Sequence, residues 1–202
     1  MSRKLIHIGT GPLFVLSWPF FSDNSDARYW AALVPLIITL KFVGIGIGWI
    51  DDAAAVKSMT RHNDPREILK GPLFYGIVFI ACTVLFWRTS PVGMLALMIM
   101  CGGDGFADII GRRFGIHKLP LSGGKSWAGS AAMLVAGFSF GFSVLLLFNY
   151  LGYFESAFDW KIIAINVAVI SFVATLVEAL PFKDIDNLTL TTVSVVLAQI
   201  LF

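Results

Sequence analysis

The sequence has 202 residues, of which 57% are hydrophobic and only 14% are charged, and its mean hydropathy is +0.80. This composition excludes a water-soluble globular domain, which needs more polar surface to stay in solution. A net charge of +2 does not suggest a nucleic-acid-binding protein. Cys82 and Cys101 both lie inside apolar runs, so a disulfide framework is not expected.

Seven apolar segments approach the length of about 20 residues that a bilayer-spanning helix requires. They are continuous and not alternating, which favours helices over a β-barrel. We therefore predict an all-α, polytopic membrane helical bundle of about seven transmembrane helices, in a single domain over residues 1–202. The predicted spans are Leu5–Phe21, Tyr29–Ile50, Pro72–Trp87, Val92–Ile110, Ala128–Leu151, Ile162–Leu180 and Leu188–Phe202. The first, third and last are short, and short spans tilt less or enter the bilayer only part-way.

The basic residues favour one side of the predicted membrane. If the connections alternate between two sides, the side of the N-terminus receives eleven lysines and arginines and the other side receives three. By the positive-inside rule, the richer side faces the cytoplasm or its topological equivalent. The eleven are Arg3, Lys4, Lys57, Arg61, Arg66, Lys70, Arg112, Arg113, Lys118, Lys125 and Lys183, and the three are Arg28, Arg88 and Lys161.

The segment CGGDGFADIIGRRFG, Cys101–Gly115, places two carboxylates at the end of an apolar run. Asp104 and Asp108 are four residues apart, so on a helix they share a face, and Arg112 continues it. Carboxylates at a membrane boundary are costly and are commonly kept for a cation, a proton or a substrate. Two carboxylates with one side open suit Mg²⁺, which proteins hold with one or two carboxylates plus substrate phosphates.

The glycines around Asp104 add to this interpretation. Gly102, Gly103 and Gly105 remove side chains around the carboxylate and would let a ligand approach the backbone closely. The plainer alternative is an Asp108–Arg112 ion pair in the headgroup region. That alternative does not explain Asp104 or the glycines.

The next connection, LSGGKSWAGS at Leu121–Ser130, partly matches the phosphate-binding P-loop through Gly124-Lys125-Ser126. The match fails because the first glycine of the pattern should stand at Leu119, and no strand precedes the loop. Small residues and a lysine before a helix still favour anions. A flexible turn with an incidental lysine is the alternative.

Two further groups of charged residues lie on the same side, and Arg3, Lys4 and His7 lie there too, at the start of the first predicted span. Arg61, Arg66 and Lys70 recur every four to five residues, which predicts an amphipathic helix that ends at Gly71-Pro72. This helix would hold a polyphosphate or simply carry headgroup-facing charge.

Glu178 lies inside an apolar helix, one turn before Pro181, and Asp184, Asp186 and Asn187 follow it. A carboxylate within a membrane segment indicates a functional site. Metal-holding carboxylates, phosphate-holding cations and an apolar cavity together favour phosphate or nucleotide chemistry on a lipid.

Six stretches resemble the phytol kinase and farnesol kinase group of the polyprenol kinase family, in unbroken order from Arg3 to near the C-terminus. The most specific are the D-G-x-A-D-x-x-G-R-R-[FY]-G core within Gly102–Gly115 and the K-S-x-x-G-S continuation. The stretches are RKLIHIG (Arg3–Gly9), WPFFS (Trp18–Ser22), VKSMTRHNDPREILKGPLFY (Val56–Tyr75), GGDGFADIIGRRFG (Gly102–Gly115), KLPLSGGKSWAGS (Lys118–Ser130) and VEALPFKDIDN (Val177–Asn187).

The resemblance implies transfer of the γ-phosphoryl group of CTP to an isoprenoid alcohol, with phytol as the best-known acceptor and tocopherol synthesis as one use of the product. Farnesol and geranylgeraniol are the alternative acceptors. The partners would be this alcohol, the nucleotide and the lipid bilayer. The resemblance alone implies a chloroplast membrane. Plant members carry a transit peptide before the motif that starts at Arg3 in this sequence, and no targeting segment is seen here that would support the location independently.

On this basis Asp104 and Asp108 would hold Mg²⁺, while Lys125 and Arg112 would neutralise phosphate oxygens. Glu178 or Asp186 would complete the metal shell or take the proton of the alcohol. The residues expected to contact the nucleotide are Gly103, Gly105, Arg112, Arg113, Gly124, Ser126, Arg66 and Lys70.

Two alternatives stay open at this point. A lipid-phosphate cytidylyltransferase also uses CTP and Mg²⁺, but releases pyrophosphate. A transporter also keeps carboxylates inside the membrane, although here they gather at one face and no inverted repeat is visible. The choice of alcohol, CTP against UTP or ATP, and the oligomeric state are not predicted.

Overall fold

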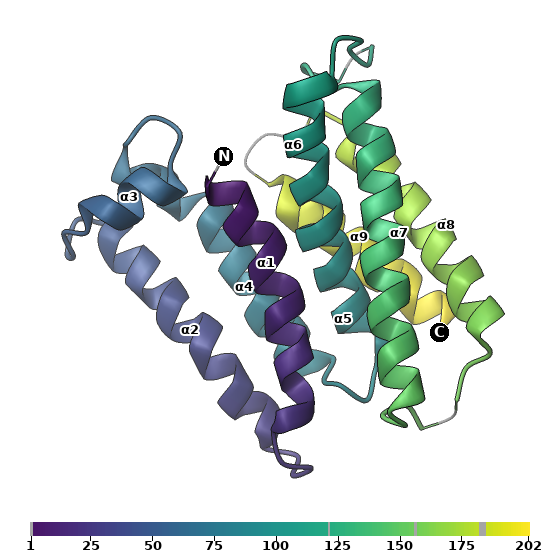
Figure 1. The fold of residues 1–202 in the computed structure, drawn as a ribbon. Coiled ribbons are helices and arrows are strands. Elements are labelled where there is room, and N and C mark those ends of the chain that lie inside the picture. The colour runs from purple at the N-terminus through teal and green to yellow at the C-terminus, as the bar shows by residue number, and fades with distance from the viewer. Residues whose placement is uncertain (1, 121, 156, 182–184) are drawn as a thin grey trace.

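The computed structural model describes residues 2–120, 122–155, 157–181 and 185–202. The described chain folds into a bundle of helices, with one isolated bridge between Lys118 and Ser126 (Figure 1). The helices are α1 (Ser2–Ser17), α2 (Ala27–Gly46), α3 (Ala53–Met59), α4 (Gly71–Leu85), α5 (Pro91–Met98), α6 (Gly105–Phe114), α7 (Trp127–Tyr150), α8 (Trp160–Glu178) and α9 (Asp186–Leu201). Shorter elements are the 3₁₀-helices η1 (Trp18–Phe20) and η2 (Pro65–Leu69) and the π-helix η3 (Ile99–Asp104).

The all-α membrane-type bundle that the sequence predicts is confirmed. Each of the seven predicted spans is helical over most of its length. Five helical stretches in the described chain are long and apolar enough to cross a membrane: Ala27–Gly46, Pro65–Leu85, Pro91–Phe114, Trp127–Tyr150 and Trp160–Glu178. Helices α1 and α9 have 16 residues each and are shorter than these. A count of seven membrane crossings therefore stays a prediction.

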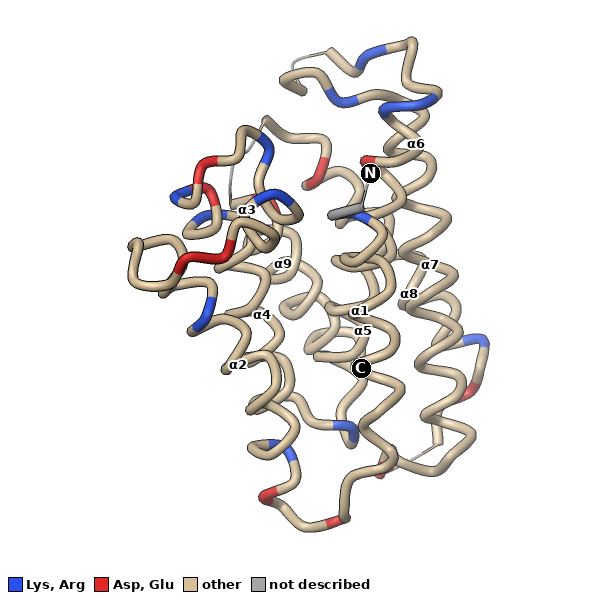
Figure 2. The backbone as a smooth tube through the Cα atoms, turned by 60° about the vertical axis from the view of Figure 1, so that its left-hand side comes forward, with Lys and Arg blue, Asp and Glu red and all other residues tan. Residues whose placement is uncertain are grey.

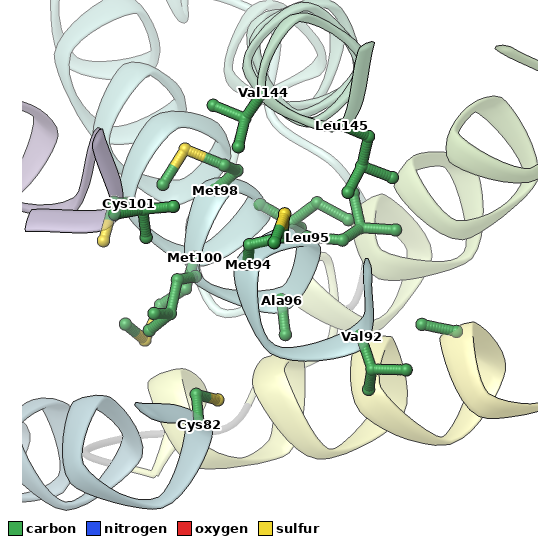
Figure 3. Close-up of a cluster of buried hydrophobic side chains, with 14 of the residues drawn as sticks. Cys82, Val92, Met94, Leu95, Ala96, Met98, Met100, Cys101, Val144 and Leu145 are labelled. Carbon is green, nitrogen blue, oxygen red and sulfur yellow. The ribbon is translucent and has the colours of Figure 1, made fainter. Parts of the chain in front are cut away.

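The centre of the bundle is the helix formed by α5 and η3. Every residue from Met94 to Cys101 is fully buried, and helices α1, α4, α7 and α9 surround this segment. Figure 3 shows its methionines and leucine between Val144 and Leu145 of α7 on one side and Cys82 of α4 on another. A helix that is apolar on all faces is expected at such a central position.

The π-helix η3 joins α5 to α6 without a break. Short π-helical turns are rare and often occur at functional sites. At Gly102, a Cβ atom would lie 2.7 Å from the ring of Phe140 on α7, so the absence of a side chain allows the close packing of η3 on α7. The π-helix ends at Asp104, which is itself buried.

The prediction of one amphipathic helix between α2 and α4 is wrong. Helix α3 ends at Met59, and η2 begins only at Pro65. Between them Asn63 has a φ of 58°, a left-handed conformation that interrupts a helix. The Glu67 carboxylate accepts the backbone N–H of Arg61 at 2.5 Å and so folds the loop back on η2.

Charged residues gather mainly at one end of the bundle, where the N-terminus, the α2–α4 connection and the α6–α7 connection lie together (Figures 1 and 2). Fewer charges lie at the opposite end, and the middle of the bundle is almost free of them (Figure 2). This arrangement agrees with the prediction that successive connections alternate between two sides of the membrane, with most lysines and arginines on the side of the N-terminus.

The opposite end is held together by Arg88, whose side chain is buried. Its guanidinium donates hydrogen bonds to the carbonyl oxygens of Trp18, Phe21 and Ser22 at 2.8–2.9 Å and to Asp23 at 2.5 Å. It also lies 4.9 Å from the centre of the Tyr153 ring. One side chain therefore joins the end of α1 to the α4–α5 and α7–α8 connections.

Arg88→Met should lower the free energy of unfolding by about 3 kcal/mol, because one buried and two partly buried carbonyl oxygens would lose their donor. Asp23→Asn should lower it by less than about 1 kcal/mol, because the Asp23 side chain is exposed to solvent. Thermal unfolding in detergent would compare the two variants. Equal losses would show that the ion pair, and not the carbonyl contacts, holds this end together.

Candidate active site

Asp104 is the buried centre of the charged end. Lys4 Nζ lies 2.5 Å from its Oδ2 atom, and His7 Nε2 lies 3.4 Å from the same oxygen. Both side chains come from α1, which approaches α6 closely because Gly105 has no side chain: a Cβ there would lie 2.3 Å from the Ile8 side chain. The glycine therefore positions Lys4 and His7 on Asp104.

The imidazole of His7 has a defined orientation. Its Nε2 also lies 3.2 Å from the Met100 carbonyl oxygen, so two acceptors face this nitrogen, and Nε2 carries a hydrogen. The ring packs against Tyr75, with centroids 4.3 Å apart. Tyr75 Oη is 2.9 Å from Thr10 Oγ1 and 3.3 Å from the His7 carbonyl oxygen, so α4 supports this part of α1.

Asp108 stands one turn beyond Asp104 and is less buried. Arg112 Nε donates to its Oδ1 at 2.8 Å, so the plain ion pair considered in the sequence analysis does form. Asp108 and Arg112 also line a cavity of about 620 Å³ between α6, the start of α1 and the α3–η2 loop. The other lining residues are Lys4, Thr60, Arg61, Ile109 and Arg113.

Lys125 and Glu178 form a second ion pair. Lys125 Nζ lies 2.7 Å from Glu178 Oε1 and also donates to the Glu178 main-chain carbonyl. Both side chains are largely buried, and both are close enough to Asp104 to interact with it electrostatically. Asp186 interacts with Glu178 in the same way. Lys125, Glu178 and Asp186 therefore belong to the charge cluster around Asp104.

The loop before α7 is closed by its own hydrogen bonds. The backbone N–H of Leu119 donates to the Lys125 carbonyl at 2.8 Å, and Gly124 has a φ of 109°, which favours glycine. Open space lies beside Gly124, where a ligand can approach. Ser126 is buried and caps α7 by accepting the Gly129 N–H at 3.2 Å, so its hydroxyl has a structural role. Leu121 lies outside the described residues.

Three cavities adjoin at the charged end. A polar cavity of about 250 Å³ shares Lys4 and Arg61 with the cavity beside Asp108. It shares His7, Gly71, Pro72 and Asn187 with an apolar groove of about 380 Å³ that runs along α1, α2 and α4. The other residues of the polar cavity are His62, Glu67, Lys70 and Asp186.

The structure brings most of the predicted site residues to this end. Arg66 is exposed and lines none of the three cavities, whereas Lys70 lines the polar one. Gly103 and Gly105 are buried against Met133 and Ile8, so protein and not open space lies beside them. Their contact with a nucleotide stays a prediction. Asp184 lies outside the described residues.

Lys4, His7 and Asn187 were not predicted as site residues. Lys4 and His7 are three residues apart, which places them on one face of α1. Basic residues at the start of an apolar segment are, however, usual for the positive-inside rule, and this conceals their position inside the bundle.

The residues present are compatible with Mg²⁺. In the described ranges no three His, Cys, Asp or Glu side chains gather as a metal site. Mg²⁺ is seldom bound by such a cage, since it is usually held by one or two carboxylates together with phosphates and water. Asp104 and Asp108, one helical turn apart, offer carboxylate oxygens of this kind. Metal binding by them stays a prediction.

Known proteins to which the chain is similar are named as chloroplastic phytol kinases. The chain is 45% identical over its full length to phytol kinase 1, chloroplastic, of Arabidopsis thaliana, of which it covers 66%. It is also 45% identical to a probable phytol kinase 1, chloroplastic, of Glycine max, of which it covers 67%, and 42% identical to one of Oryza sativa, of which it covers 64%. The chain thus spans about two thirds of the length of these relatives. No protein-family model and no solved structure matches it.

Proposed function

Because the chain belongs to the phytol kinase family, we propose that it is a prenyl alcohol kinase. It transfers the γ-phosphoryl group of CTP to the hydroxyl of an isoprenoid alcohol, and phytol is the expected acceptor. The named relatives support the kinase reaction and the alcohol. CTP as the donor rests on the resemblance described above.

The adjoining cavities are the observation that carries this proposal. A prenyl alcohol has a long apolar chain and one hydroxyl group, and a nucleoside triphosphate has several negative charges. The apolar groove meets the polar cavity at His7, Gly71, Pro72 and Asn187, and the polar cavity meets the Asp108 cavity at Lys4 and Arg61. The hydroxyl and the phosphates would therefore meet near Asp104.

Phosphoryl transfer depends mainly on positioning and on neutralisation of charge. The hydroxyl oxygen forms a bond to the γ-phosphorus, the bond to the β–γ bridging oxygen breaks, and CDP leaves. Lys4, Arg61 and Arg112 surround the space where phosphate oxygens would lie. Lys125 would join them, and Glu178 or Asp186 would accept the proton of the hydroxyl.

Mg²⁺ would be held by Asp104 and Asp108, and when bound it would supply charge neutralisation at the phosphate oxygens. Lys4 and Arg112, which contact these carboxylates, would then turn toward the phosphates.

The proposed location is a chloroplast membrane. It rests on the chloroplastic relatives and on the five helices that are long and apolar enough to cross a bilayer. The phosphorylated alcohol would then be available for tocopherol synthesis.

The test uses membranes that contain the full chain, γ-labelled CTP and phytol, farnesol or geranylgeraniol. Labelled prenyl phosphate and CDP are the expected products, with UTP and ATP as slower donors. Release of pyrophosphate from CTP and a lipid phosphate would instead show a cytidylyltransferase. If no nucleotide labels any alcohol, the proposed function is wrong.

A further inference from the structure

We infer that the apolar groove between α1, α2 and α4 binds the prenyl chain of the alcohol, and that the chain enters sideways from the lipid between α1 and α2. The inference rests on the proposed function and adds to it the place and the route of the substrate.

Each of the three helices contributes one stripe of side chains to the groove. Residues 6, 7, 10, 13 and 14 of α1 line one wall, residues 34, 35, 38, 39 and 42 of α2 line the other, and residues 71, 72, 75, 76 and 79 of α4 form the floor. These spacings of three and four residues each describe a single helix face. Nearly all of the lining surface of the groove is apolar, as a hydrocarbon chain requires.

The groove exists because α2 packs mainly on α4 and has at most a weak contact with α1. Gly76 of α4 allows this, since a Cβ there would lie 2.0 Å from Thr39 Oγ1 of α2. In Figure 1, α2 stands apart from α1 along most of its length. The groove is therefore closed below by α4 and has its side opening between the two walls.

The residues at this opening are exposed although they are apolar. Leu13 of α1 is 70% exposed, and Val34 and Ile38 of α2 are 55% and 47% exposed. Leu13 lies in the part of α1 after Lys4, and Val34 and Ile38 lie in α2 between Arg28 and Lys41, and neither stretch contains Asp, Glu, Lys or Arg. Such side chains face lipid tails in a membrane, so an alcohol dissolved in the bilayer reaches the groove without crossing water.

The polar groups of the groove orient the ligand in one direction. His7 and Asn187 stand at the end shared with the polar cavity, where a hydroxyl can form hydrogen bonds. From His7 to Phe14 the groove follows seven residues of helix, or about 10 Å at 1.5 Å per residue. This length holds the first isoprene units, and the rest of a long chain extends through the side opening.

The experiment compares Ile38→Trp with Ile37→Trp. Ile38 lines the groove, whereas Ile37 is its neighbour on α2, is 63% exposed and does not line the groove. Both side chains are exposed enough that an indole should not disturb helix packing. Phosphorylation by the full chain would be measured with geraniol, farnesol and phytol, whose chains increase in length.

Ile38→Trp should lower kcat/KM for phytol by about tenfold and for geraniol by less than about twofold. The reason is that only the longer chain extends as far as the indole and collides with it. Ile37→Trp should change neither value by more than about twofold. Equal losses for the three alcohols, or equal losses in the two variants, would overturn the inference. Equal losses for all alcohols would indicate that another helix or a structural lipid occupies the groove.

A failure of the proposed function gives a different result. If the wild-type chain phosphorylates none of the alcohols, the kinase proposal is wrong, and the groove is then tested by binding. A photoreactive farnesol analogue should label peptides of α1, α2 and α4 in wild-type protein and at least about fivefold less in Ile38→Trp. Labelling confined to other helices would overturn the groove as the chain-binding site.

Discussion

Replacement of Asp104 by asparagine is expected to lower phosphate transfer about a thousandfold while the protein stays folded. Asparagine keeps the shape of the side chain and still offers an oxygen to Lys4, which lies 2.5 Å away in the native protein. It removes the negative charge that the reaction would need for a metal ion. Loss of the buried ion pair with Lys4 should also lower thermal stability, but the loss in kcat/KM should be far larger than the fraction of unfolded protein can explain.

A graded set of variants makes this result specific. Asp108→Asn should lose less activity, about tenfold, because Asp108 is more exposed and is already paired with Arg112. Asp26→Asn, at the opposite end of the bundle, should retain wild-type activity. The residual activity of Asp104→Asn should need at least about tenfold more Mg²⁺ for half-maximal rate. Asp104→Asn protein with wild-type rates and the wild-type Mg²⁺ requirement would remove Asp104 from the reaction.

The helices follow from simple sequence patterns. The predicted span Pro72–Trp87 corresponds to α4 at Gly71–Leu85, and Ala128–Leu151 corresponds to α7 at Trp127–Tyr150. Apolar runs of the right length define such helices, and proline or serine marks where they begin. The membrane environment makes these patterns reliable because an unpaired backbone is costly in lipid.

Two local features were beyond sequence reasoning because they depend on tertiary contacts. The π-helix η3 depends on packing against α7, where Phe140 occupies the space beside Gly102. The predicted amphipathic helix failed at Asn63, whose left-handed conformation is stabilised by a loop that Glu67 holds in place. Regular spacing of Arg61 and Arg66 does not reveal such a turn.

Site residues were predicted where a charged residue interrupts an apolar run. They were missed where a charged residue precedes such a run. Asp104 and Glu178 stand out because each follows many apolar residues. Lys4 and His7 precede an apolar run, a usual place for membrane-flanking charge. Only the packing of Gly105 against Ile8 turns them toward Asp104. The position of a site therefore depends on helix packing, even where its chemistry can be inferred from residue types.

Lys125→Met is expected to lower kcat/KM about a hundredfold, because the lost ammonium would neutralise developing charge on the phosphates. In the structure this ammonium contacts the carboxylate and the main-chain carbonyl of Glu178. A bound nucleotide would have to draw it away from Glu178. Glu178→Gln weakens this competing contact, so it should lower the KM for CTP and reduce kcat less than about tenfold.

A double-mutant cycle separates this role from a structural one. If Lys125 only anchors the end of α8 through Glu178, then both single variants and the double variant lose the same activity and the same thermal stability. If Lys125 acts on the phosphates, Lys125→Met loses at least about tenfold more activity than Glu178→Gln at similar stability. If instead Glu178→Gln abolishes turnover in folded protein, Glu178 is the group that accepts the hydroxyl proton, and the Lys125 contact serves to position it.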